Sequence, residues 1–231
     1  MRLLLFSPIL FFAATLSVDA RAQGVFDMST LTNTLSAPTQ PSAGGAARPP
    51  AAPAASGAAF RFTPSLELRK RNYAQFIEKT RAATPQGADE LQKLFAQKDV
   101  IAEIAPALAG FGLRTDDVAD AMTVYWLNAW MASRGRSDQN SKEQAQAVRR
   151  QAANAMAATG QIATLNDARK QEMAEAFLIQ AMLLEAMNAQ AKADPAKMAQ
   201  VQASARTGAK AMSLDLDAME LTPTGFVLAK R

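Results

Sequence analysis

The stretch that decides the fold is 115–135, TDDVADAMTVYWLNAWMASRG. It contains both tryptophans of the chain, Trp126 and Trp130, and Tyr125, one of its two tyrosines. At 100° per residue, apolar side chains occupy nearly the whole circumference, a pattern typical of a buried helix. No other stretch has as much aromatic area to remove from water. We therefore expect this helix to lie at the centre of the fold.

A second apolar helix is predicted from Asn166 or Asp167 to about Ala193. Between Met173 and Met187 its apolar residues again occur on nearly every side. Such a helix must also be buried, so we expect it to form a second spine of the core.

Helix-start signals divide the remaining chain. A capping side chain, often followed by proline in the first turn, marks each start. We expect Thr115 to cap the central helix and Ser141 to form a capping box with Gln144. Pro106 should kink its helix or end it early, and Gly208 should mildly interrupt the last helix. The other starts are Thr63-Pro64, Thr84-Pro85, Asp99 and Asp194-Pro195.

The last residues of the chain have the pattern of strands and not of a helix. Two short apolar stretches, 218–221 and 226–228, flank Thr222-Pro223-Thr224-Gly225, which has proline and glycine where a tight turn needs them. This pattern predicts a small hairpin, with the alternating residues 60–63 as a possible third strand. The predicted fold is therefore all-α, a compact bundle of about seven helices with a small C-terminal β-hairpin.

Composition divides the chain of 231 residues into three parts. Residues 1–22 have a positive tip, a short apolar run and small residues near the end, which predicts a signal peptide cleaved after Ala22. Residues 23–59 are rich in Pro and Ala and predict a disordered tether. Residues 60–231 form the helical domain. We therefore expect a secreted or periplasmic protein without a transmembrane segment in its mature form.

The missing residue types restrict the chemistry most. The chain has no cysteine and no histidine, which excludes Cys/His zinc sites and Ser-His-Asp or Cys-His nucleophile systems. A net charge of +4 is too small for a nucleic-acid footprint, so we expect no nucleic-acid partner. No pattern indicates a cofactor or a metal, and enzymatic activity is not expected, although carboxylates leave it open.

Two carboxylates on the second spine are candidate catalytic residues. Glu175 and Glu185 fall within about 80° of each other on the helical wheel, and a pair of buried carboxylates can cleave glycosidic bonds. The interpretation that we favour is structural. Charged residues are seldom fully buried, so these two and Glu172 should line a solvated strip of the helix.

Polar and aromatic residues of the central helix are candidates for a pocket. Asp120 and Asn128 need hydrogen-bond partners if buried, so they form either a pocket floor or a structural network. Tyr125, Trp126 and Trp130 could stack a sugar or a base, but four-residue spacing on an apolar helix favours a role in the core.

Three stretches, ELRKRNYAQFIEKT, FGLRTDDVADAMTVYWLNAW and LDLDAMELTPTGFV, resemble an uncharacterised family of secreted bacterial helical domains, a domain of unknown function. The likeness covers residues 60–227. It implies export, one domain and helical content, but no activity or ligand.

Three functions are consistent with these patterns. The first is a secreted or periplasmic, non-enzymatic module that binds a protein or an envelope component. The alternative is a carboxylate-dependent hydrolase acting on cell-wall glycan. The third is association with a membrane surface through the basic residues 69–71. The sequence leaves the oligomeric state open.

Overall fold

The computed structural model describes residues 57–229, in which seven α-helices and one antiparallel hairpin are present. The helices are α2 (Leu66–Ala83), α3 (Pro85–Gln97), α4 (Val100–Gly110), α5 (Val118–Ser133), α6 (Lys142–Ala158), α7 (Asp167–Gln190) and α8 (Pro195–Ala211). Short 3-10 turns are η3 (Gly57–Phe60), η4 (Ile162–Thr164), η5 (Ala191–Ala193) and η6 (Leu216–Ala218). The strands are β1 (Met219–Thr222) and β2 (Gly225–Leu228). The predicted fold class is confirmed.

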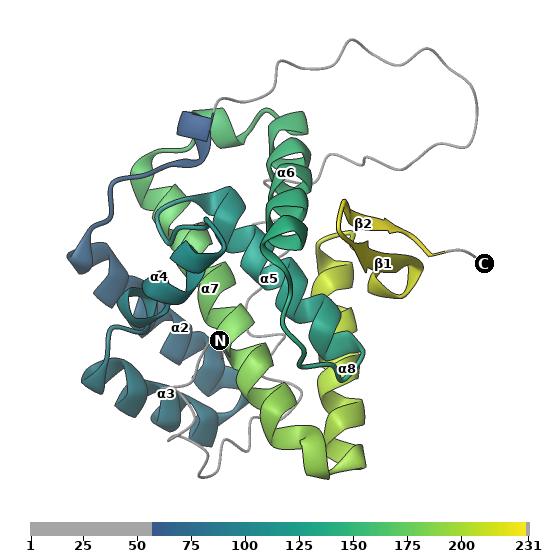
Figure 1. Cartoon of the computed structure of the whole chain (residues 1–231). Coiled ribbons are helices and arrows are strands. Elements are labelled where there is room, and N and C mark those ends of the chain that lie inside the picture. Colours follow the sequence, from purple (N-terminus) through teal and green to yellow (C-terminus); the bar gives the residue numbers. More distant parts are fainter. Residues whose placement is uncertain (1–56, 230–231) are drawn as a thin grey trace.

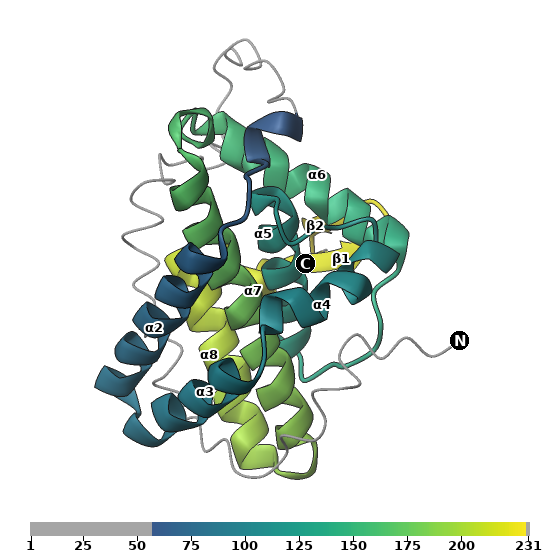
Figure 2. The ribbon, with the colours of Figure 1, turned by 90° about the vertical axis from the view of Figure 1, so that its left-hand side faces the viewer.

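The two apolar helices form the centre of the domain. Helices α5 and α7 pack along each other, with α2, α3 and α4 on one side and α6, α8 and the hairpin on the other (Figures 1 and 2). Every residue of α5 except Asn128 is buried. The burial expected for the central helix is therefore confirmed.

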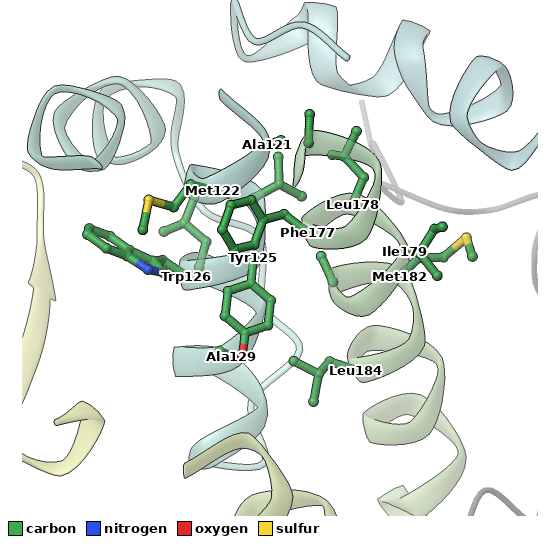
Figure 3. Packing of buried hydrophobic residues seen from close by; sticks show 14 of the residues in the cluster. Ala121, Met122, Tyr125, Trp126, Ala129, Phe177, Leu178, Ile179, Met182 and Leu184 are labelled. Atoms are coloured by element: carbon green, nitrogen blue, oxygen red, sulfur yellow. The ribbon is translucent and has the colours of Figure 1, made fainter. Parts of the chain in front are cut away.

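The seam between α5 and α7 is filled by aromatic and aliphatic side chains. Figure 3 shows Tyr125 projecting towards Phe177, and their ring centroids lie 5.8 Å apart. Trp126 lies on the opposite side of α5, away from α7 (Figure 3). The aromatic residues of α5 therefore pack into different parts of the core.

Helix α8 packs against α5 beside the Tyr125 side chain. It is continuous through Gly208, contrary to the interruption expected there. A Cβ at this position would lie 2.8 Å from the Tyr125 hydroxyl, nearer than real Cβ contacts. Gly208 therefore gives the tyrosine room without breaking the helix, because a single helical glycine costs only about 1 kcal/mol.

Several capping predictions hold and two name the wrong residue. Thr84 stands at the N-cap of α3 as predicted, but its side chain makes no capping hydrogen bond. Asp99, Ser141 and Asn166 cap α4, α6 and α7 through their side chains, and Ser141 forms the predicted capping box. Ser65, two residues after Thr63, caps α2. Asp117, two residues after Thr115, caps α5.

In both wrong cases a second contact fixes the helix start. The backbone N–H of Ser65 donates to the side chain of Gln171 on α7, and Asp117 forms an ion pair with Arg149 on α6. Pro106 does not end its helix, since α4 continues to Gly110. These tertiary contacts are not visible in the local pattern.

The hairpin is confirmed, but residues 60–63 do not join it as a third strand. Thr222 pairs with Gly225 across the turn, and the Gln151 side chain of α6 bonds both the N–H and the C=O of Phe226. The outer edge of β2 is therefore already occupied at Phe226. Residues 60–63 instead run to the start of α5, where Arg61 forms an isolated bridge with Asp117.

The predicted signal peptide (1–22) and nearly all of the predicted tether (23–59) lie outside the described residues and stay predictions. Within residues 57–229, no helix combines the length and the apolar character needed to cross a membrane.

Candidate functional site

A cleft of about 810 Å³ lies at the N-terminal end of α5. Its walls come from residues 57–63, the loop before α5, one face of α6 and the start of α7. The charged residues that line it are Arg61, Arg114, Asp117, Asp120, Arg149, Arg150 and Asp167. We call this site the arginine cleft, after Arg61, Arg114, Arg149 and Arg150.

Hydrogen bonds to backbone carbonyls hold the walls of the cleft in place. The N–H of Phe62 donates to the carbonyl of Asp116 at 3.2 Å, which fixes residues 57–63 against the loop before α5. The Gln146 amide on α6 donates to the carbonyls of Phe111 and Gly112, at 2.7 and 3.2 Å. The cleft is therefore built on anchored segments.

Asp117 and Asp120 form the buried floor, exposed by only 2% and 3%. One oxygen of Asp117 caps α5 by accepting from the N–H groups of Ala119 and Asp120, and the other lies 3.3 Å from Arg149 Nη2. Asp120 accepts from Arg149 Nε at 2.7 Å and from the backbone N–H of Arg114 at 2.9 Å. The guanidinium of Arg149 therefore bonds to both carboxylates.

The surroundings of Asp120 disfavour its charged form. Burial, and after it the negative charge of Asp117, raise the pKa of Asp120 to about 6, although Arg149 acts in the opposite direction. A like charge nearby disfavours ionisation of the Asp120 carboxyl. The charge of Asp120 therefore changes near neutral pH.

The cleft has more hydrogen-bond donors than acceptors. Each arginine carries five N–H donors, but the bonds to carboxylates use only one from Arg61, two from Arg114 and two from Arg149. Within residues 57–229, no hydrogen bond or ion pair engages the exposed side chain of Arg150. The acceptor oxygens of the floor are meanwhile already bonded.

The model of a family described as "Family of unknown function (DUF6683)" matches residues 13–229. The chain belongs to this family. The DUF6683 match confirms the expected likeness to an uncharacterised domain. No curated protein and no solved structure matches the chain.

Of the predicted site residues in this DUF6683 chain, Asp120 lines the cleft. Its carboxylate accepts hydrogen bonds from Arg149 and from the backbone of Arg114. Asn128 is half-buried and donates to the carbonyl of Val124 in its own helix, a local contact without a pocket role.

The aromatic residues do not form one stacking site. Tyr125 faces α7, whereas the Trp130 ring lies 6.2 Å from Phe226 of the hairpin and its Nε1 donates to the carbonyl of Met219. Trp126 is 8% exposed. The core role favoured for these side chains agrees with their burial.

The solvated strip expected for the glutamates is wrong for Glu175. This residue is fully buried, accepting from Arg69 Nε at 2.9 Å and from Asn72 at 2.6 Å, with Gln171 as a third donor. Arg69 also pairs with Asp99 at 2.6 Å. Helices α2, α4 and α7 therefore meet in a closed polar network that explains how the charge is tolerated.

Glu185 lies further along α7 and does not share a site with Glu175. Its Oε2 is buried and makes no hydrogen bond within residues 57–229. Burial raises the pKa of Glu185 to about 7. Ten residues of helix separate the two glutamates by roughly 15 Å along the axis, beyond the ~5–9.5 Å between the carboxyl groups of glycosidases.

Sequence reasoning missed the arginines of the cleft. Asp120 was visible as a polar residue in an apolar helix, but its partner Arg149 lies 29 residues further on. The one local signal is the pair Arg149-Arg150 on an otherwise Ala-rich helix. In residues 57–229, no group of three or more carboxylates is arranged to hold a metal ion.

Proposed function

We propose that this chain is an exported, non-enzymatic binding domain whose arginine cleft holds the oxyanion group, a phosphate or a carboxylate, of a cell-envelope component. The surplus of guanidinium donors over the carboxylate oxygens of the cleft carries this proposal. Guanidinium groups match carboxylate and phosphate in geometry and bind them through paired N–H groups.

The size of the cleft suits such a ligand. Sites for small molecules span about 300–1,000 Å³, and this cleft has about 810 Å³. It can receive one sugar phosphate or one uronic acid, free or at the end of a larger envelope molecule. Arg61 is 45% exposed and Arg149 25% exposed, so their remaining N–H groups are accessible.

Export rests on the leader sequence. Residues 1–22 resemble a signal peptide, and residues 23–59 would separate the folded domain from its point of attachment or release. Cell fractionation and N-terminal sequencing test this part. A mature protein that begins at Gln23 outside the cytoplasm supports it, whereas a cytoplasmic chain that keeps residues 1–22 contradicts it.

Calorimetric titration of the full mature chain tests the ligand. Inorganic phosphate and glucuronate distinguish phosphate from carboxylate recognition, and glucose is the uncharged control. We expect Arg150→Glu to weaken binding about tenfold, which corresponds to ~1.4 kcal/mol. Arg71→Glu, the same charge change on an exposed residue of α2 outside the cleft, should have little effect. If neither anion binds the wild type, the proposal is wrong.

The other two functions receive no support from the positions of their residues. The hydrolase would use Glu175 and Glu185, but Glu175 is bonded within a closed network and Glu185 is far from it. Membrane association would use residues 69–71, but Arg69 points inward, with a side chain only 11% exposed.

A further inference from the structure

Three charged residues surround Asp120. They are Asp117 on the same helix, Arg149 on α6 and Arg114 in the loop before α5, whose backbone N–H bonds Asp120. Asp167 at the start of α7 lines the same cleft, with a carboxylate that accepts from the N–H of Thr63. Asp120 and Asp117 therefore both bond the guanidinium of Arg149.

An anion entering the cleft meets this arrangement directly. It adds a third negative charge beside Asp117 and Asp120, and it competes with both for Arg149. Repulsion between like charges is strong where water is largely excluded. A proton on Asp120 relieves the conflict, because it removes one negative charge and leaves the Nε–H of Arg149 free for the ligand.

Resting on the function proposed above, we propose that anion binding in the arginine cleft is coupled to protonation of Asp120, so that the ligand is held more tightly in acid than at neutral pH. Asp120 accepts the proton on its carboxylate when the anion binds and returns it to water when the anion leaves. No other reactant is needed.

The direction and size follow from linkage. The pKa of Asp120 in the free protein is already about 6, and a bound anion raises it further. Affinity is then greatest below pH 6 and falls as the pH rises through the pKa of the bound state. Each unit by which the ligand raises the pKa adds a factor of ten to this change. We expect sulfate to bind about tenfold more tightly at pH 5 than at pH 8.

Sulfate is the suitable probe because its own charge stays constant over this range, whereas that of phosphate changes. Calorimetric titration of the full mature chain at pH 5 and pH 8 gives the ratio of dissociation constants. Asp120→Asn should bind sulfate with nearly the same affinity at both values. Asp167→Asn removes an exposed carboxylate of the same cleft and should keep the wild-type ratio.

A second measurement needs no variant, in case Asp120→Asn folds poorly. Titrations of the wild type at pH 6.5 in two buffers of different ionisation enthalpy count the protons taken up with sulfate. Uptake of a substantial fraction of one proton supports the coupling. Binding without proton uptake, or with equal affinity at pH 5 and pH 8, overturns the coupling alone. No binding of sulfate, phosphate or glucuronate at any pH overturns the proposed function as well.

Discussion

Gly208→Ala should destabilise the domain, although alanine is normally the better helix residue. Gly208 lies inside α8, where replacing glycine by alanine ordinarily gains about 1 kcal/mol. Here the new Cβ would lie 2.8 Å from the Tyr125 hydroxyl. Tyr125 is 2% exposed and packs against Phe177, so its ring has little room to withdraw.

The magnitude follows from two opposing contributions. Overpacking of a tight core costs about 1–3 kcal/mol, and the helix preference of alanine offsets about 1 kcal/mol of it. We expect Gly208→Ala to lower the free energy of unfolding by about 1 kcal/mol. Apart from its chain neighbours and the backbone of its own helix, the hydroxyl is the one atom within 4 Å of this Cβ. In a Tyr125→Phe background the same change should therefore stabilise by up to about 1 kcal/mol.

Urea unfolding of the wild type, both single variants and the double variant measures this coupling. The four free energies form a double-mutant cycle, in which the intrinsic cost of Tyr125→Phe cancels. Gly87→Ala is the matched control, since Gly87 is also helical but its Cβ would make ordinary contacts at 3.4 Å or more. The reasoning fails if Gly208→Ala has the same effect in the wild type and in the Tyr125→Phe background.

Four further substitutions test the buried groups and one cap. Because burial raises the pKa of Glu185 from 4.5 to about 7, the folded state binds this proton more tightly than the unfolded chain. The wild type should therefore lose about 3 kcal/mol of stability as the pH rises from 4.5 through 7. Urea unfolding at pH 5 and pH 8 measures this loss, which should be much smaller for Glu185→Gln. Glu175→Ala leaves Arg69 without its buried partner and should cost about 3–5 kcal/mol, whereas Glu90→Ala, which breaks a more exposed pair, should cost less than about 1 kcal/mol in the same assay. Trp126→Ala should cost about 3–5 kcal/mol on thermal unfolding, and a loss below about 1 kcal/mol would place the ring outside the core. Ser141→Ala removes the capping box and should cost about 1 kcal/mol, and an unchanged melting temperature would contradict a role for this cap.

The helices could be located from the sequence because their signals are short-range. Asp99, Ser141 and Asn166 accept from N–H groups three residues further on, so the cap and its partner occur in one short pattern. Burial of α5 could also be predicted, since apolar side chains all round a helix leave no face for water.

The same reasoning fails where a distant partner decides. The sequence of α7 predicted a solvated Glu175, because the local pattern contains its charge but not its partner. The guanidinium that compensates this charge belongs to Arg69, 106 residues earlier. Residues 60–63 alternate like a strand of the hairpin, but their backbone pairs with Asp116 and Asp117 at the start of α5. Alternation alone does not specify a partner.

The chain's local patterns were thus sufficient for its helical character, for most helix starts, for the hairpin and for the central place of α5. These features depend on the period of apolar residues and on bonds between near neighbours. The arginine cleft depends on packing instead. Asp120 and Arg149 lie on different helices, and only the packing of α6 against α5 brings the carboxylate and the guanidinium to 2.7 Å. Burial at that contact then raises the pKa of Asp120, a property that neither residue has in an unfolded chain.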